Sequence, residues 1–182
     1  MSYKFNPIKT IVLVGLMGAG KTCIGSRLAE RLSVPFIDAD EEIESAAGCS
    51  ITNIFELYGE KEFRSGERRV IKRLLKQPVQ VLATGGGAFV DAEIRRSVKS
   101  TATSVWLRAD LDLLVSRTSR RGDRPLLKGK DHRKALLKLM EDRHPFYSQA
   151  DLIVDSGTEP PVVTVEKIVE ALKKNQTKKS RR

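Results

Sequence analysis

The strongest constraint on the fold is the segment from Gly15 to Thr22, which reads GLMGAGKT. It follows a run of β-branched and aliphatic residues, TIVLV, at 10–14 and precedes a helical pattern at 21–32. The segment fits the pattern G-x-x-x-x-G-K-[ST], whose glycines let successive backbone N–H groups point inward at phosphate oxygens. The start of the helix adds the positive end of its dipole to the same place. We therefore expect a phosphate-binding loop between a buried strand and a helix, with a chance match in a glycine-rich turn as the alternative.

The rest of the chain alternates short β-branched runs with helical patterns, which is typical of a parallel sheet covered by helices. Because the run at 10–14 is apolar throughout its centre, it fits a central strand buried on both faces. Asp91 and Asp110 stand in helix N-cap positions. The remaining expected strands are 35–37, 79–83, 104–107 and 152–155. The expected helices are 21–32, 39–46, 51–58, 60–76, 92–98, 111–118, 131–142 and 162–174.

Composition limits the class of protein. With 182 residues, of which 40% are hydrophobic and 31% charged, the chain suits one medium-sized α/β domain, and its apolar runs are too short to span a membrane. Two cysteines exclude a disulfide framework, and the N-terminal segment lacks the apolar stretch of a secretory signal. We expect a soluble cytoplasmic protein. His132 and His144 lack the spacing of a metal site.

The formal net charge of +10 suggests polyanionic partners such as nucleic acid, membrane headgroups or phosphorylated ligands. Residues 117–138 carry nine Lys or Arg against two Asp, and residues 173–182 carry six basic residues and no acidic ones. Since these two segments contribute +7 and +6, the remaining 150 residues sum to −3. We expect the first segment to be exposed and movable and the second to be a disordered tail.

Two acidic residues follow the second expected strand. Asp38 and Asp40 lie at the carboxyl edge of the sheet, where open α/β sheets bind ligands. Their spacing allows one carboxylate to support Mg²⁺ beside the Thr22 hydroxyl and the other to accept a proton from an acceptor hydroxyl. In the alternative interpretation Asp38 only caps the following helix, and the acids at 40–44 are solvated.

Three glycines, Gly85 to Gly87, follow the strand expected at 79–83. Because a glycine within regular structure costs about 0.5–1 kcal/mol relative to alanine, three in a row indicate close approach of the backbone to a ligand or to another segment. A flexible structural turn is the alternative.

A phosphate loop occurs in several classes of protein, and the rest of the chain narrows the choice. The chain has no N-K-x-D guanine motif and no room for the accessory elements of motor proteins, which favours a small phosphotransferase.

Together with these motifs, further segments resemble the shikimate kinase family, which has a nucleoside-monophosphate-kinase-like fold. They are FELYGEKEFR at 55–64, RPLL at 124–127, RHPFY at 143–147, and Arg117 seven residues before Arg124. The resemblance covers roughly residues 8–172 and lies in the order and spacing of all the motifs. It implies a three-layer α/β/α domain over 1–172 with a five-stranded parallel sheet of order 2-3-1-4-5. The substrate segment would lie at about 39–64 and a mobile lid at about 117–138.

The resemblance also implies a role for each site residue. Arg64 and Arg143 would grip a substrate carboxylate, which agrees with the match between a guanidinium and two carboxylate oxygens. The implied nucleotide-binding residues are Gly18, Ala19, Gly20, Lys21, Thr22, Cys23, Arg117, which would stack against adenine, and Arg124, which would contact the transferring phosphate. The implied shikimate-binding residues are Asp40, Arg64, Gly86, Gly87 and Arg143. The implied catalytic residues are Lys21, Asp40 as candidate base and Arg124, and the implied Mg²⁺ residues are Thr22 and Asp38. The side chain of Cys23 is expected to be buried in the first helical turn.

By resemblance, the reaction is Mg²⁺-dependent phosphoryl transfer from ATP to the 3-hydroxyl of shikimate, a step of chorismate and aromatic amino acid biosynthesis. The expected partners are ATP and shikimate, with no membrane and no nucleic acid, and the expected state is a monomer. One alternative is a related kinase of another small hydroxy acid, such as gluconate. The other is a polyanion-binding protein that uses ATP as a switch, which only the charge suggests.

Overall fold

The computed structural model describes residues 5–119 and 131–179. Arg124, most of the expected lid and the last three residues lie outside this part of the chain. The described helices are α1 (Lys21–Leu32), α2 (Ala39–Ala47), α3 (Ile51–Leu74), α4 (Ala92–Thr101), α5 (Leu111–Ser119), α6 (His132–Tyr147) and α7 (Pro161–Lys179), with a short 3₁₀ helix η1 (Ala88–Val90). No helix among the described residues is long and apolar enough to cross a membrane.

The five strands form one parallel sheet in the order β2-β3-β1-β4-β5, as the resemblance implies. They are β1 (Thr10–Val14), β2 (Phe36–Asp38), β3 (Val81–Ala83), β4 (Ala102–Arg108) and β5 (Leu152–Asp155). The central strand is β1, and its four residues 11–14 have no exposed surface. A strand flanked on both sides and covered on both faces requires an unbroken apolar sequence, which explains the pattern of this segment.

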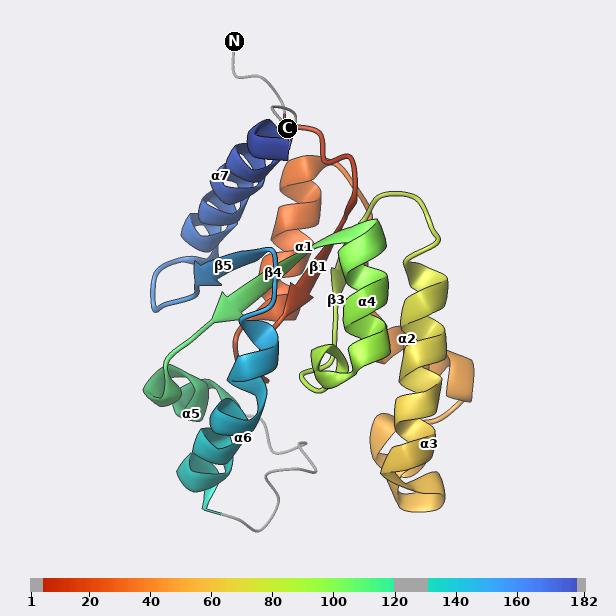
Figure 1. Ribbon diagram of the computed structural model, residues 1–182. Helices are drawn as coiled ribbons and strands as arrows, with labels where there is room; N and C mark the ends of the chain where they lie inside the picture. Colours follow the sequence, from red (N-terminus) through yellow and green to blue (C-terminus); the bar gives the residue numbers. More distant parts are fainter. Residues whose placement is uncertain (1–4, 120–130, 180–182) are drawn as a thin grey trace.

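Helices cover both faces of the sheet. Figure 1 shows α4 in front of the sheet and α1 behind it, with α7 packed against α1. The connecting helices lie on opposite faces because the crossovers between parallel strands are right-handed. The chain passes from β1 toward the β2 edge of the sheet and later from β3 toward the β5 edge. The carboxyl ends of the strands meet at one edge, and α2, α3, α5 and α6 surround that edge (Figure 1).

The expected division between helices at 51–58 and 60–76 is confirmed, because Gly59 breaks the helical geometry within α3 with φ 79° and ψ 171°. Other helical ends differ from the expectation, and the helix expected at 131–142 continues to Tyr147. At the other end of the chain, α7 continues to Lys179, whereas disorder was predicted from residue 173. That prediction was wrong for 173–179, because lysine and glutamine extend a helix easily and lysines favour its negative C-terminal end.

Candidate active site

The phosphate loop joins β1 to α1 and has the geometry that its glycines permit. Gly15, Gly18 and Gly20 adopt positive φ angles of 140°, 83° and 95°, which residues with a Cβ rarely adopt. Lys21 folds back over the loop, and its Nζ atom donates to the backbone oxygens of Gly15 at 2.8 Å and Leu16 at 3.0 Å. The loop therefore holds a positive charge beside the N-terminus of α1, which suits a bound phosphate.

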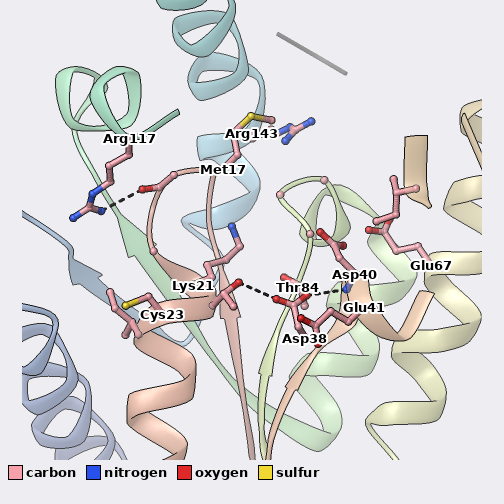
Figure 2. Close-up of a pocket in the computed structure, with 18 of the residues that line it drawn as sticks. Met17, Lys21, Cys23, Asp38, Asp40, Glu41, Glu67, Thr84, Arg117 and Arg143 are labelled. Carbon is pink, nitrogen blue, oxygen red and sulfur yellow. Dashed lines mark hydrogen bonds between the residues drawn. The ribbon is translucent and has the colours of Figure 1, made fainter. Parts of the chain in front are cut away.

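Asp38 both caps α2 and faces the phosphate loop. Its Oδ1 atom accepts from the backbone N–H of Asp40 at 3.0 Å, and its Oδ2 atom accepts from Thr22 Oγ1 at 2.8 Å (Figure 2). A hydroxyl and a carboxylate at this distance offer the oxygen ligands that Mg²⁺ prefers. No group of three or more His, Cys, Asp or Glu residues among those described could hold a metal ion. The pair therefore fits a Mg²⁺ ion that takes its other ligands from phosphate and water.

The glycine turn at 85–87 follows β3 and meets three charged side chains. A Cβ on the first glycine would lie 2.8 Å from Asp40 Oδ1. On the second it would lie 3.0 Å from Arg143 Nη1, and on the third 2.6 Å from Arg64 Nη1. Each glycine thus leaves room for a different functional group, which supports the close-approach interpretation over a merely flexible turn.

Arg64 projects from α3 toward the glycine turn and is held by acidic neighbours. Its Nη1 atom donates to Glu67 Oε2 at 2.7 Å, and its Nη2 atom lies 3.5 Å from Glu60 Oε1. The Glu67 side chain is only 1% exposed. Burial raises the pKa of Glu67, and the nearby Arg64 offsets this only in part. A carboxylate this deep in the protein requires a positive partner, and Arg64 is that partner.

Arg143 approaches the same turn from α6 and is itself buried, with 9% of its surface exposed. One helical turn later, the fully buried Tyr147 donates its hydroxyl proton to the backbone oxygen of Gly86. Burial raises the pKa of Tyr147 to about 12, against the opposing effect of Arg143, so the phenol stays protonated at neutral pH. This bond ties the helix that carries Arg143 to the glycine turn.

Arg117 connects two loops on the other side of the phosphate loop. Its guanidinium donates to the backbone oxygen of Gly18 at 3.2 Å and to that of Gly157, in the loop after β5, at 2.8 Å. Ser156 Oγ in the same loop donates to the backbone oxygen of Ala19 at 3.1 Å. The loop after β5 is therefore a wall of the site.

These groups line one continuous cavity of about 1410 Å³. A pocket for a single small ligand usually measures about 300–1,000 Å³, so this volume suits a nucleotide together with a second small molecule. Of the predicted residues, the cavity is lined by Gly18, Gly20, Lys21, Thr22, Cys23, Asp38, Asp40, Arg64, Gly86, Gly87, Arg117 and Arg143. Ala19, in the phosphate loop, is not among the lining residues and is buried, with 1% of its surface exposed.

Comparison with known proteins shows which family this chain is related to. The family model described as shikimate kinase matches residues 17–173. The chain belongs to the shikimate kinase family. It is 57% identical to the shikimate kinase of Paramagnetospirillum magneticum over 164 residues, which cover 90% of this chain and 84% of that protein. It is 56% identical to the shikimate kinase of Caulobacter vibrioides over 165 residues, which cover 91% of this chain and 82% of that one.

Solved structures of the family have the same fold. The shikimate kinase of Acinetobacter baumannii, solved in complex with shikimate, superposes with a TM-score of 0.90 at 37% identity, covering 94% of this chain and 96% of that one. A gluconokinase from Sinorhizobium meliloti superposes with a TM-score of only 0.63 at 20% identity and shares the fold alone. The resemblance seen in the motifs is thereby confirmed at the level of the family.

Several lining residues were not predicted from the sequence. Glu67 was missed, although a signal exists, because it occupies the apolar stripe of α3 between Phe63 and Val70, where a lone acid indicates a buried partner. The loop at 156–159 carries no motif and was missed without such a signal. The expected burial of Cys23 was wrong, since this residue is exposed and lines the cavity.

Proposed function

We propose that the protein is a shikimate kinase that transfers the γ-phosphoryl group of ATP to the 3-hydroxyl of shikimate, releasing ADP and shikimate 3-phosphate. The observation that carries this proposal is the convergence of Arg64, Arg143 and Asp40 on one glycine turn, next to a phosphate loop in the same cavity. Membership of the family and likeness to a shikimate-bound relative support it. The reaction serves chorismate and aromatic amino acid biosynthesis.

The acceptor end of the cavity suits a small hydroxy acid. Arg64 and Arg143 reach the glycine turn from different helices, so a carboxylate between them receives charge-assisted hydrogen bonds from both sides. Asp40 borders the same turn from α2 and offers an acceptor for the reacting hydroxyl. In this proposal, Arg64 and Arg143 bind the carboxylate, Asp40 accepts the hydroxyl proton, and Gly86 and Gly87 line the pocket of the same small molecule.

The nucleotide end follows from the phosphate loop. Backbone N–H groups of Gly18 to Cys23 bind the phosphates, and Lys21 exchanges its loop carbonyls for phosphate oxygens when ATP binds. Arg117 lies between the phosphate loop and the loop after β5, where its flat guanidinium offers a face to adenine. Arg124 acts on the transferring phosphate.

Thr22 and Asp38 are the residues that would hold Mg²⁺. When bound, the ion neutralises charge on the phosphate oxygens of ATP. The chain's own contribution is to align donor and acceptor, because phosphoryl transfer through a loose transition state depends mainly on positioning and charge. Asp40 orients the acceptor hydroxyl and receives its proton at a carboxylate oxygen. Closure of the lid predicted at about 117–138 would exclude water from the cavity. The ends of that range belong to α5 and α6, where Thr118 and Leu136 are buried, so the expectation of an exposed and movable segment is wrong for those ends. We further propose that the protein acts as a cytoplasmic monomer.

The test is ADP release with a panel of acceptors that includes shikimate and gluconate. We expect release that depends on shikimate, and its absence from folded protein would contradict the proposal. Arg64→Ala is expected to raise the KM for shikimate at least about tenfold through the loss of a charge-assisted bond. Arg68→Ala is the matched control, because Arg68 lies on the same helix but binds Asp91 at 3.0 Å. It should leave that KM unchanged.

A further inference from the structure

The carboxylate of Glu67 is incompletely satisfied. Its Oε2 atom accepts from Arg64, but its Oε1 atom has no hydrogen-bond partner, and it is the one buried side-chain oxygen or nitrogen in this condition among the described residues. An ionised carboxylate with an unpaired, buried oxygen is poorly stabilised. The bare oxygen faces the cavity side of the glycine turn, 3.2 Å from where a Cβ on Gly85 would lie.

The charged groups around Glu67 come from several elements. Asp40 on α2 borders the same glycine, with its Oδ1 atom 2.8 Å from the position of that Cβ (Figure 2). Asp91 at the N-cap of α4 adds a second negative charge. Arg64 is the cation in direct contact. The remaining groups act through these neighbours: Glu60 binds Arg64, Arg68 binds Asp91, and Arg143 and the neutral Tyr147 of α6 reach the turn from its far side.

The carboxylate of a bound acceptor changes the balance of charge around Glu67. The acceptor's carboxylate would add a negative charge to a site that already holds Glu67, Asp40 and Asp91, and the two guanidiniums at the glycine turn are those of Arg64 and Arg143. An added negative charge in a buried site is costly, and the usual response is that a carboxylate becomes neutral. Glu67 is the group placed to do so, because its Oε1 atom can carry the proton while its Oε2 atom still accepts from Arg64.

We propose that Glu67 takes up one proton from solvent when shikimate binds, and thereby frees the charge of Arg64 for the substrate carboxylate. Glu67 is thus a positioning residue whose protonation is coupled to binding, and this inference rests on the proposed function. The new O–H bond forms on Oε1, and no other bond changes. Burial already raises the pKa of Glu67 in the empty site, which brings its titration closer to neutral pH.

The sign of the pH dependence follows from the coupling. Binding that takes up a proton becomes weaker as the pH rises, by up to about tenfold in affinity per pH unit for one proton. The effect is confined to the range between the pKa of Glu67 in the empty site and its higher pKa in the complex. Any contribution from His144 is common to variants at position 67.

The experiment is calorimetry of shikimate binding in two buffers with different ionisation enthalpies, from about pH 6 to about pH 9. We expect the wild-type protein to take up a proton on binding in part of this range. Glu67→Gln should bind shikimate with an affinity that is flat in pH and with almost no proton uptake. Glu60→Gln is the matched control, because Glu60 also contacts Arg64 but its side chain is 66% exposed. It should keep the wild-type uptake.

Proton uptake that is absent in the wild type, or unchanged in Glu67→Gln, would overturn the inference. Uptake that persists in Glu67→Gln and disappears in Asp40→Asn would assign the proton to Asp40 instead. If circular dichroism shows that Glu67→Gln does not fold, the number of protons that the wild-type protein takes up on binding shikimate still tests the inference across the pH range. No heat with shikimate in any buffer would contradict the proposed function rather than the coupling.

Discussion

The glycine turn at 85–87 gives a residue-scale prediction for substrate affinity. A Cβ on Gly87 would lie 2.6 Å from Arg64 Nη1 and 2.7 Å from its Cζ atom, both at the far end of a flexible side chain. Arg64 can therefore move, but it then leaves its place in the site beside Glu67. We expect Gly87→Ala to raise the KM for shikimate at least about tenfold, as for loss of one charge-assisted bond. Steady-state kinetics checks this, and the KM for ATP should not change.

Tyr147 gives a second residue-scale prediction, for stability against pH. Because burial raises its pKa to about 12, the folded protein keeps the phenol proton between about pH 10 and pH 12, while the unfolded chain loses it. Stability from this group is therefore complete below about pH 10 and is lost as the pH rises toward 12, by about 2–3 kcal/mol in total. Urea unfolding of the wild type and of Tyr147→Phe should diverge in this range. Parallel curves would contradict the prediction.

The bend in α3 is a feature of the element scale. Gly59 has φ 79° and ψ 171°, a conformation open almost only to glycine, whereas Gly66 seven residues later is helical. A Cβ would meet nothing within 4 Å at either position. We expect Gly59→Ala to destabilise the protein by about 1–3 kcal/mol through backbone strain, and Gly66→Ala to stabilise it by about 0.5–1 kcal/mol. Denaturant unfolding measures both, and equal effects would show that strain is not the cause.

Elements with a local signal could be predicted from the sequence. The apolar segment of β1, the cap residue Asp91 and the helix after the phosphate loop all have causes within a few residues of their own position. The strand order came from family resemblance, because periodicity does not say which strands are neighbours. The end of α6 was missed, because the helix expected at 131–142 continues through Pro145 to Tyr147, although a proline within a helix is unfavourable.

The residues of the site could likewise be predicted where the local sequence carries a signal. The residues of the phosphate loop and the pair Asp38 and Asp40 form continuous motifs, and their chemistry could be inferred from spacing. The partner of Arg64 could be inferred only in principle, because Glu67 becomes a buried carboxylate only after α3 packs under the glycine turn. Contacts that depend on tertiary packing, such as that of Arg117 with Gly157, leave no trace in the local sequence.

At the scale of the whole molecule, the positive charge at the C-terminal end of α7 lies far from the active site. The C-terminal end of α7 lies at the opposite end of the molecule from α3, α5 and α6, which surround the site (Figure 1). Residues 173–182 carry six positive charges, while the chain outside this segment and 117–138 is slightly acidic, at −3. Of the described basic residues in 117–138, Arg117 lines the cavity, which suits a polyphosphate. We therefore expect the C-terminal charge to attract other polyanions.

Removal of residues 173–182 tests this separation. Leu172, 5% exposed, is the last core residue of α7, so the deletion keeps the buried face of the helix. We expect elution from immobilised heparin at lower salt and a shallower dependence of binding on salt, because fewer counterions are released. The kcat/KM for shikimate should stay unchanged. Replacement of Lys173, Lys174, Lys178 and Lys179 by glutamine, which keeps the helix, should reproduce most of the effect. Unchanged heparin retention in both variants would contradict this prediction and favour the basic residues of 117–138 as the source of polyanion binding.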